Sequence, residues 1–248
     1  HLALVLGGAG AKLSKRHGAT SAEEFKGQGI LPEALLNTVA LLGWNPGTEQ
    51  EIFTLEELVA AFSIDRVHQA GAIFDREKML WVNQQHMKRY THLELTRLAE
   101  PFLLQQHGVL WQDFPNKEHA VAIVRERART LTEIADGVGF LLTLPEYEIT
   151  LLVPKKGSPQ RADEALRAAQ EILSNPLPQE RDGVQRMLEE YATTVGLTRG
   201  EFFWPLRAAL SGSAASPGVT EILFTLGADE VRQRLGMARK RLAALLKS

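Results

Sequence analysis

Residues 119–142, HAVAIVRERARTLTEIADGVGFLL, decide the fold class of this chain. Their apolar side chains recur at helical intervals and form one stripe, made of Val121, Val124, Ala128, Leu131, Ala135 and Val138. Arg125 and Arg129 lie four positions apart, so a helix would place them together on a face away from the centre of that stripe. The segment therefore predicts amphipathic helix and not strand.

Helical patterns continue on both sides of this segment. Before it, helices are predicted at 32–42, 54–62 and 75–90, and the helical period persists from about 83 to 145. After it come a Pro- and Gly-containing break at 146–163, predicted to be a domain boundary or an exposed linker, and helices at 162–173, 184–195, 201–210, 219–226 and 229–246. Capping boxes mark three helix starts, at Ser21 with Glu24, Thr54 with Glu57, and Thr198 with Glu201.

A short apolar run at the start of the chain is the exception. Residues 2–6 are typical of a buried strand that ends at Gly7, and almost nothing after residue 20 resembles a strand. This strand is predicted to lack its sheet, so that it is disordered or pairs with another copy of the chain. The predicted fold is mostly α, with a short α/β beginning.

Composition sets limits on what the chain does. Its 248 residues are 44% hydrophobic and 23% charged, which is ordinary for a globular protein, and the net charge of −2 means that nucleic-acid binding requires local basic patches. The absence of cysteine excludes disulfides, thiolate catalysis and Cys-ligated metals. The seven histidines show no metal-ligand spacing, and no apolar run is long enough to cross a membrane.

A basic loop follows the first strand. Residues 12–18, KLSKRHG, come after the glycine-rich stretch 7–11, but the spacing fits neither a P-loop nor a Rossmann fingerprint. Lysines on such a loop could close on a phosphate chain as charge develops in a transition state. The alternative from spacing alone is a solvated basic turn.

The loop carries a family resemblance. KLSKR resembles the KMSKS signature of class I aminoacyl-tRNA synthetases, and KLSKRHGATS…GILPEALLNTVALLGW resembles the form found in bacterial glutamyl-tRNA synthetases. Residues 202–227, FFWPLRAALSGSAASPGVTEILFTLG, resemble the distal anticodon-binding region of the same family. Leu13 stands where the signature has Met, and Arg16 where it ends in Ser. The resemblance covers essentially the whole chain, and it corresponds to the C-terminal half of the family's usual protein.

The resemblance implies roles for particular residues. Lys15 would contact the ATP phosphates during formation of glutamyl-adenylate, with Lys12 and Ser14 shaping the catalytic loop and Arg16 beside them. The implied tRNA contacts are Arg125, Arg127 and Arg129 in a first helical subdomain, and Arg207 and Ser211 in a distal one. Solvated surface charge is the alternative for these arginines, and Trp204 would be either core or a base-stacking residue.

It also implies an organisation and an activity. Residues 1–82 would hold the end of the catalytic domain and the stem-contact fold, and residues 83–151 and 152–248 two helical anticodon-binding subdomains. The complete cytoplasmic, monomeric enzyme would join glutamate to tRNA(Glu) with ATP and Mg2+, both bound mainly by the other half, and no zinc is expected in this chain. We expect the chain alone to be inactive, because it lacks an HIGH-type motif.

Two alternatives stay open from the sequence. One is a free-standing, inactive tRNA-binding module derived from such an enzyme. The other is a helical scaffold that binds no RNA. The related glutaminyl branch uses β-barrels for the anticodon, so the long helical patterns favour the glutamyl branch.

Overall fold

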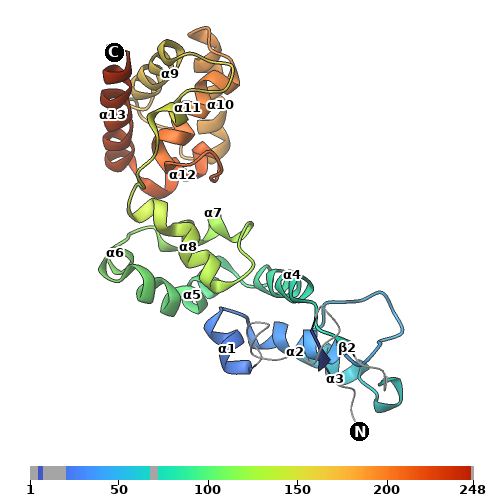
Figure 1. The fold of residues 1–248 in the computed structure, drawn as a ribbon. Coiled ribbons are helices and arrows are strands. Elements are labelled where there is room, and N and C mark those ends of the chain that lie inside the picture. Colours follow the sequence, from blue (N-terminus) through green and yellow to red (C-terminus); the bar gives the residue numbers. More distant parts are fainter. Residues whose placement is uncertain (1–4, 8–20, 68–71, 247–248) are drawn as a thin grey trace. The chain divides into compact units, whose positions relative to one another are not determined.

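The computed structural model describes residues 5–7, 21–67 and 72–246, and the fold is mostly α as predicted (Figure 1). The chain divides into two compact units. Unit 1 comprises residues 1–112 and 124–137, and unit 2 comprises residues 113–123 and 138–248. We describe each unit by itself.

The N-terminal part of unit 1 contains a small parallel sheet. Strand β1 (Val5–Leu6) pairs with β2 (Ala72–Ile73), so the first strand has a partner within the chain and is not the orphan predicted from the sequence. A strand of two residues is too short to show alternation, which is why β2 escapes sequence analysis.

Short helices accompany this sheet. They are α1 (Ala22–Gly27), α2 (Pro32–Leu41), α3 (Leu55–Ala61) and the 3-10 helix η2 (Ile64–Arg66). Helices α1 and α3 begin at the predicted capping boxes of Ser21 and Thr54. Trp44, Phe53 and Leu58 form a core cluster under α2 and α3, and α2 packs against the next helix, α4 (Arg76–Met87).

Helices α5 (His92–His107) and α6 (Val109–Gln112) follow α4 in unit 1. Residues 119–142, for which one continuous apolar stripe was predicted, do not form a single helix. They form parts of two helices, α7 (Lys117–Arg125) and α8 (Leu131–Leu142). The Thr130 hydroxyl accepts a hydrogen bond from the Glu133 N–H (3.0 Å) and so starts a new helix at this point. Arg125 and Arg129 therefore do not share one helical face.

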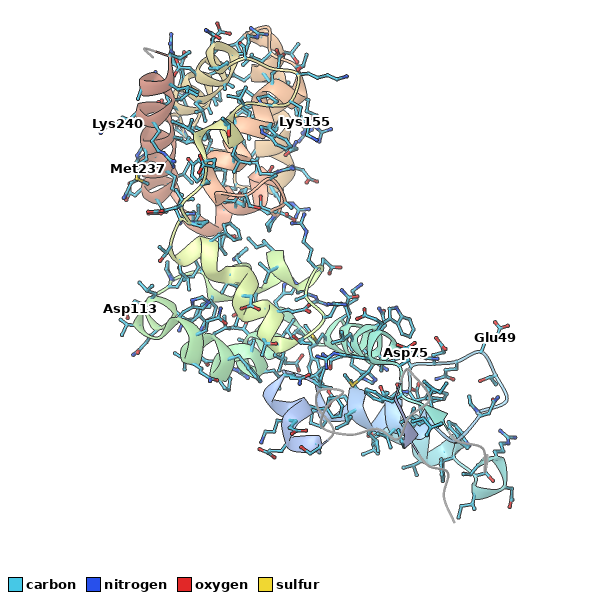
Figure 2. All side chains as sticks on the ribbon, in the orientation of Figure 1. Glu49, Asp75, Asp113, Lys155, Met237 and Lys240 are labelled. Atoms are coloured by element: carbon cyan, nitrogen blue, oxygen red, sulfur yellow. The ribbon has the colours of Figure 1, made fainter. Side chains whose placement is uncertain are left out.

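Unit 2 is a bundle of helices that contains the rest of the chain. Its elements are η3 (Ile149–Leu152), α9 (Pro159–Ile172), α10 (Arg181–Thr194), α11 (Arg199–Ser211), α12 (Val219–Leu226) and α13 (Ala228–Leu245). Helix α9 packs on α11 and α13, and α11 begins at the predicted capping box of Thr198. Leu152 is fully buried and Tyr147 is 9% exposed, so the 146–163 break is not the exposed linker predicted from the sequence. Lys155 is exposed in the turn before α9 (Figure 2).

Candidate functional site

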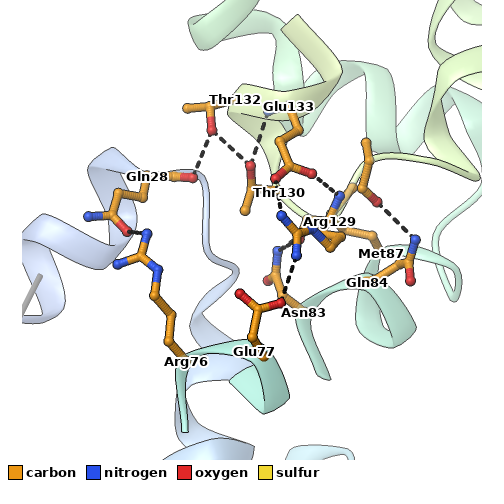
Figure 3. Close-up of polar contacts among 11 residues, drawn as sticks. Gln28, Arg76, Glu77, Asn83, Gln84, Met87, Arg129, Thr130, Thr132 and Glu133 are labelled. Atoms are coloured by element: carbon orange, nitrogen blue, oxygen red, sulfur yellow. Dashed lines mark hydrogen bonds and ion pairs between the residues drawn. The ribbon is translucent and has the colours of Figure 1, made fainter. Parts of the chain in front are cut away.

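The turn between α7 and α8 is held against two other segments of unit 1. Figure 3 shows the hydrogen bonds that join residues 128–133 to α4 and to the turn after α1. At the centre lies Asn83, whose side chain is fully buried. Its Oδ1 accepts from the Leu31 N–H (2.8 Å), and its Nδ2 donates to the Arg129 carbonyl (2.6 Å). One amide therefore joins three segments of the chain.

The glycine of the 28–31 turn makes this approach possible. Gly29 has a φ of +76°, and a Cβ on it would lie 2.7 Å from the backbone nitrogens of Leu131 and Thr132. The Leu131 N–H donates to the Gly29 carbonyl (3.0 Å), and the Thr132 hydroxyl donates to the Gln28 carbonyl (3.0 Å). The first bond satisfies a backbone N–H at the first turn of α8, and the second satisfies the Gln28 carbonyl. Only a residue without a side chain fits there.

Arg129 is held by carboxylates on both sides. Its Nη1 donates to Glu77 (3.0 Å) and its Nη2 to Glu133 (3.1 Å), while its backbone N–H donates to the other oxygen of Glu133 (2.7 Å). The hydrogen bond that Arg129 donates to Glu133 and the charge of Glu133, and more weakly the charge of Glu77, raise the pKa of Arg129. Its side chain is still 41% exposed, so part of it reaches solvent.

Arg125 is engaged differently. Its side chain is 13% exposed, and its two Nη groups donate to the carbonyls of Lys88 (2.8 Å) and Tyr90 (3.2 Å). These carbonyls lie at and just beyond the C-terminus of α4, where a cation is favoured. Arg125 therefore stabilises a helix end.

Arg127 is exposed on the same turn. Its side chain makes no hydrogen bond or ion pair within the part of the chain that the structure describes. Of the three predicted arginines, the structure thus brings Arg127 and Arg129 to the surface of one turn and places Arg125 beneath it.

The two predicted residues of unit 2 lie one helical turn apart on α11. Arg207 is half-buried, and its Nε is buried without a hydrogen-bond partner among the described residues. Ser211 is 1% exposed, and its hydroxyl donates to the Arg207 carbonyl (2.7 Å) and accepts from the Ser213 N–H (3.2 Å). Trp204 donates its indole N–H to the Leu151 carbonyl (2.8 Å), which fits a packing role.

The predicted catalytic-loop residues Lys12, Ser14, Lys15 and Arg16 lie outside the described residues. Among the described residues, no group of three or more His, Asp or Glu side chains is placed to hold a metal ion. None of the helices in the described ranges is long and apolar enough to span a membrane.

Sequence analysis missed several buried polar side chains. Asn83 and His86 lie on a polar stretch, yet His86 is 3% exposed, its Nε2 lies 3.1 Å from Asn37 Oδ1, and burial lowers its pKa. Arg234 stands in the basic C-terminal stretch, yet it is fully buried in unit 2. It donates to the carbonyls of Phe140 (2.7 Å), Leu210 (2.6 Å) and Leu141 (3.0 Å). The spacing in the sequence could have indicated a partner for Arg234, because Arg234 lies four residues after Glu230 and forms an ion pair with it (2.6 Å).

Comparison with known proteins defines the class of protein. Residues 94–239 match the family model of an anticodon binding domain, and residues 1–81 match that of the catalytic domain of class I tRNA synthetases (E and Q). The chain belongs to the anticodon-binding domain family of these synthetases.

The individual relatives are glutamate–tRNA ligases. Those of Moorella thermoacetica and Desulforudis audaxviator are 36% and 37% identical to this chain, over 97% and 96% of its length. The chain spans about half the length of these curated relatives (50% and 49%), which fits the C-terminal half of such a ligase. The crystal structure of a glutamate tRNA ligase from Elizabethkingia meningosepticum, in complex with its amino acid, is similar over 98% of this chain and 51% of that protein, with a TM-score of 0.82 and 26% identity.

Proposed function

We propose that this chain is the tRNA-binding part of a glutamate–tRNA ligase, which joins glutamate to tRNA(Glu) through glutamyl-adenylate. The observation that carries the proposal is the order of the two family matches in one chain, catalytic domain at 1–81 and anticodon binding domain at 94–239. A free-standing tRNA-binding module is not favoured, because the relatives are complete ligases about twice as long as this chain.

The proposal assigns a role to each part of the chain. Residues 1–82 would complete the catalytic domain and contact the tRNA stem, and 83–151 and 152–248 would form two anticodon-binding subdomains. ATP, with Mg2+, supplies the adenylyl group that activates glutamate. In the complete enzyme Lys15 would contact the ATP phosphates, with Lys12, Ser14 and Arg16 on the same loop. We propose a monomer that works in the cytoplasm.

The proposed tRNA contacts differ in how they act. Arg127 is exposed, the Arg129 side chain is 41% exposed, and Arg207 is half-buried, so parts of these three guanidinium groups would be available to donate to RNA. The two Nη groups of Arg125 and the Ser211 hydroxyl donate to backbone carbonyls. Arg125 and Ser211 would act as positioning residues for the segments that touch the tRNA.

Binding of the purified chain tests the proposal. Its affinity would be measured for tRNA(Glu), for tRNA(Glu) with a swapped anticodon, and for an unrelated tRNA, at two salt concentrations. We expect binding to tRNA(Glu) that weakens on the anticodon swap. Equal binding to all three tRNAs, or none, would contradict the proposed anticodon recognition.

A second experiment addresses catalysis. We expect no glutamate-dependent ATP–pyrophosphate exchange from the 248-residue chain. In the complete ligase, Lys15→Ala should slow adenylate formation while tRNA binding persists. Exchange by the chain alone would show that it contains a whole active site.

A further inference from the structure

Two neighbouring turns of unit 1 carry a concentration of basic residues. One turn, 88–90, follows α4, and the other, 126–128, follows α7. Lys88 and Arg89 are exposed on the first turn, Arg127 is exposed on the second, and Arg125 lies between them. We call these four residues, Lys88, Arg89, Arg125 and Arg127, the basic ridge.

The two turns are tied together by side chains. Arg125 donates to the carbonyls of Lys88 (2.8 Å) and Tyr90 (3.2 Å). Gln84, on the last turns of α4, donates its amide to the carbonyls of Glu126 (3.1 Å) and Ala128 (3.3 Å). The cations of the basic ridge therefore stand on backbone that is fixed before any ligand arrives, which lowers the entropic cost of binding.

Tyr90 fixes the far end of the first turn. Its hydroxyl donates to the Glu33 carboxylate, and burial together with that carboxylate raises its pKa to about 12. It is the aromatic residue of the two turns, and its polar end is already engaged. Because Tyr90 is half-buried and Ala128 is buried, every exposed side chain on these two turns is charged.

The charge of the ridge opposes that of the whole chain. Among the described residues the ion pairs of the ridge are with one carboxylate, that of Glu126, which lies 3.8 Å from Lys88 Nζ and 3.7 Å from Arg125 Nε. Glu126 is 67% exposed and Lys88 38%, so this ion pair is weak and Lys88 can exchange it for a stronger anion. A local excess of positive charge in a chain of net charge −2 indicates an anionic partner.

We propose that Lys88, Arg89 and Arg127 of the basic ridge bind backbone phosphates of the tRNA, while Arg125 holds their two turns together, and that the ridge makes no contact with the tRNA bases. This inference rests on the proposed function and adds Lys88 and Arg89 to the tRNA-binding surface. Lysine binds phosphate as a point charge, and arginine adds directed hydrogen bonds. Glu126 limits the affinity, because its carboxylate repels the phosphate that the cations attract.

The test compares two double variants of the full 248-residue chain. Lys88→Ala/Arg89→Ala removes two charges from the ridge. Arg167→Ala/Arg232→Ala removes two charges from unit 2, where these side chains are 64% and 59% exposed and pair with acids on their own helices. Circular dichroism melting establishes that both variants fold. The measured quantity is the tRNA dissociation constant as a function of salt concentration.

We expect the ridge variant to bind tRNA at least tenfold more weakly than the control. A plot of the logarithm of the association constant against the logarithm of the salt concentration should be less steep, with a slope smaller in magnitude by about 2. The loss should be equal for tRNA(Glu) and for the anticodon-swapped tRNA, because backbone phosphates carry no sequence. Glu126→Gln should bind both tRNAs several-fold more tightly.

The outcomes separate the two proposals. If the unaltered chain discriminates the anticodon swap but the ridge variant binds like the control, the basic ridge is refuted and the proposed function stands. A loss confined to tRNA(Glu) would also refute it, since it would show base recognition. If the unaltered chain binds no tRNA, both proposals fail.

Discussion

Replacing Asn83 by alanine tests whether one buried amide holds the α7–α8 turn to the rest of unit 1. The substitution removes the acceptor for the Leu31 N–H (2.8 Å) and the donor to the Arg129 carbonyl (2.6 Å). Asn83 is fully buried, so water does not replace these bonds readily. Each unpaired buried group costs about 1–3 kcal/mol, so we expect the free energy of unfolding to fall by about 2–6 kcal/mol.

A matched control lies at the next position. Gln84→Ala also removes an amide that donates to two carbonyls of the same turn, those of Glu126 and Ala128. Gln84 is only half-buried, so water takes over these carbonyls, and we expect a loss of about 0.5–1.5 kcal/mol. The difference between the stability losses of the two variants therefore reports the effect of burial rather than the effect of losing an amide that binds this turn.

Urea unfolding followed by circular dichroism would measure both losses, and amide hydrogen exchange would report on Leu31 itself. We expect the Leu31 amide to exchange faster in Asn83→Ala and to keep its rate in Gln84→Ala. Equal losses in the two variants, with unchanged exchange at Leu31, would refute the role assigned to Asn83.

Three further predictions concern other positions. Gly29→Ala should destabilise the protein by at least about 1–2 kcal/mol, because a left-handed residue with a Cβ is strained and the Cβ would lie 2.7 Å from the backbone of α8; Gly27→Ala, whose Cβ would meet nothing within 4 Å, should be neutral in the same thermal melts. Arg234→Met should cost more than about 2 kcal/mol in chemical unfolding, because three carbonyls lose their donor, whereas the exposed Arg232→Met should change little. Hydrogen bonds from Arg161 and Thr198 lower the Glu201 pKa from 4.5 to about 2, so the Glu201 carboxylate stabilises the fold above about pH 4.5 and this contribution is lost as the pH falls toward 2. In Glu201→Gln the free energy of unfolding should therefore fall less between pH 4.5 and 2, and an unchanged pH dependence would contradict the assignment.

Local signals in the sequence predicted most of the helices. The capping boxes of Ser21, Thr54 and Thr198 mark the observed starts of α1, α3 and α11, because a cap depends on residues only three positions apart. The periodic segment at 219–226 is observed as α12 with the same bounds. These features are fixed by neighbours in sequence, and sequence patterns report on them directly.

The candidate site could not be predicted in the same way. The break between α7 and α8 lies inside a continuous apolar stripe, and it is stabilised by Gly29 and Asn83, which are distant in sequence. Periodicity carries no information about such partners, so it did not show that the Arg125 guanidinium binds carbonyls at the end of α4. The roles that the family resemblance implies for these residues stay predictions, and the structure adds which of their polar groups already bind other parts of the protein.

The Asn83 amide has a consequence for engineering. The two family matches leave residues 82–93 between them, which invites a chimaera joined there, with the anticodon-binding part of one ligase on the catalytic part of another. Such a junction would bring together a 28–31 turn and an α7–α8 turn of different ancestry, although they share backbone hydrogen bonds and a contact that tolerates only glycine. A chimaera should therefore take residues 28–31 and α4 from the same protein as α7 and α8. The boundaries of the family matches do not coincide with the boundaries of the segments that pack together.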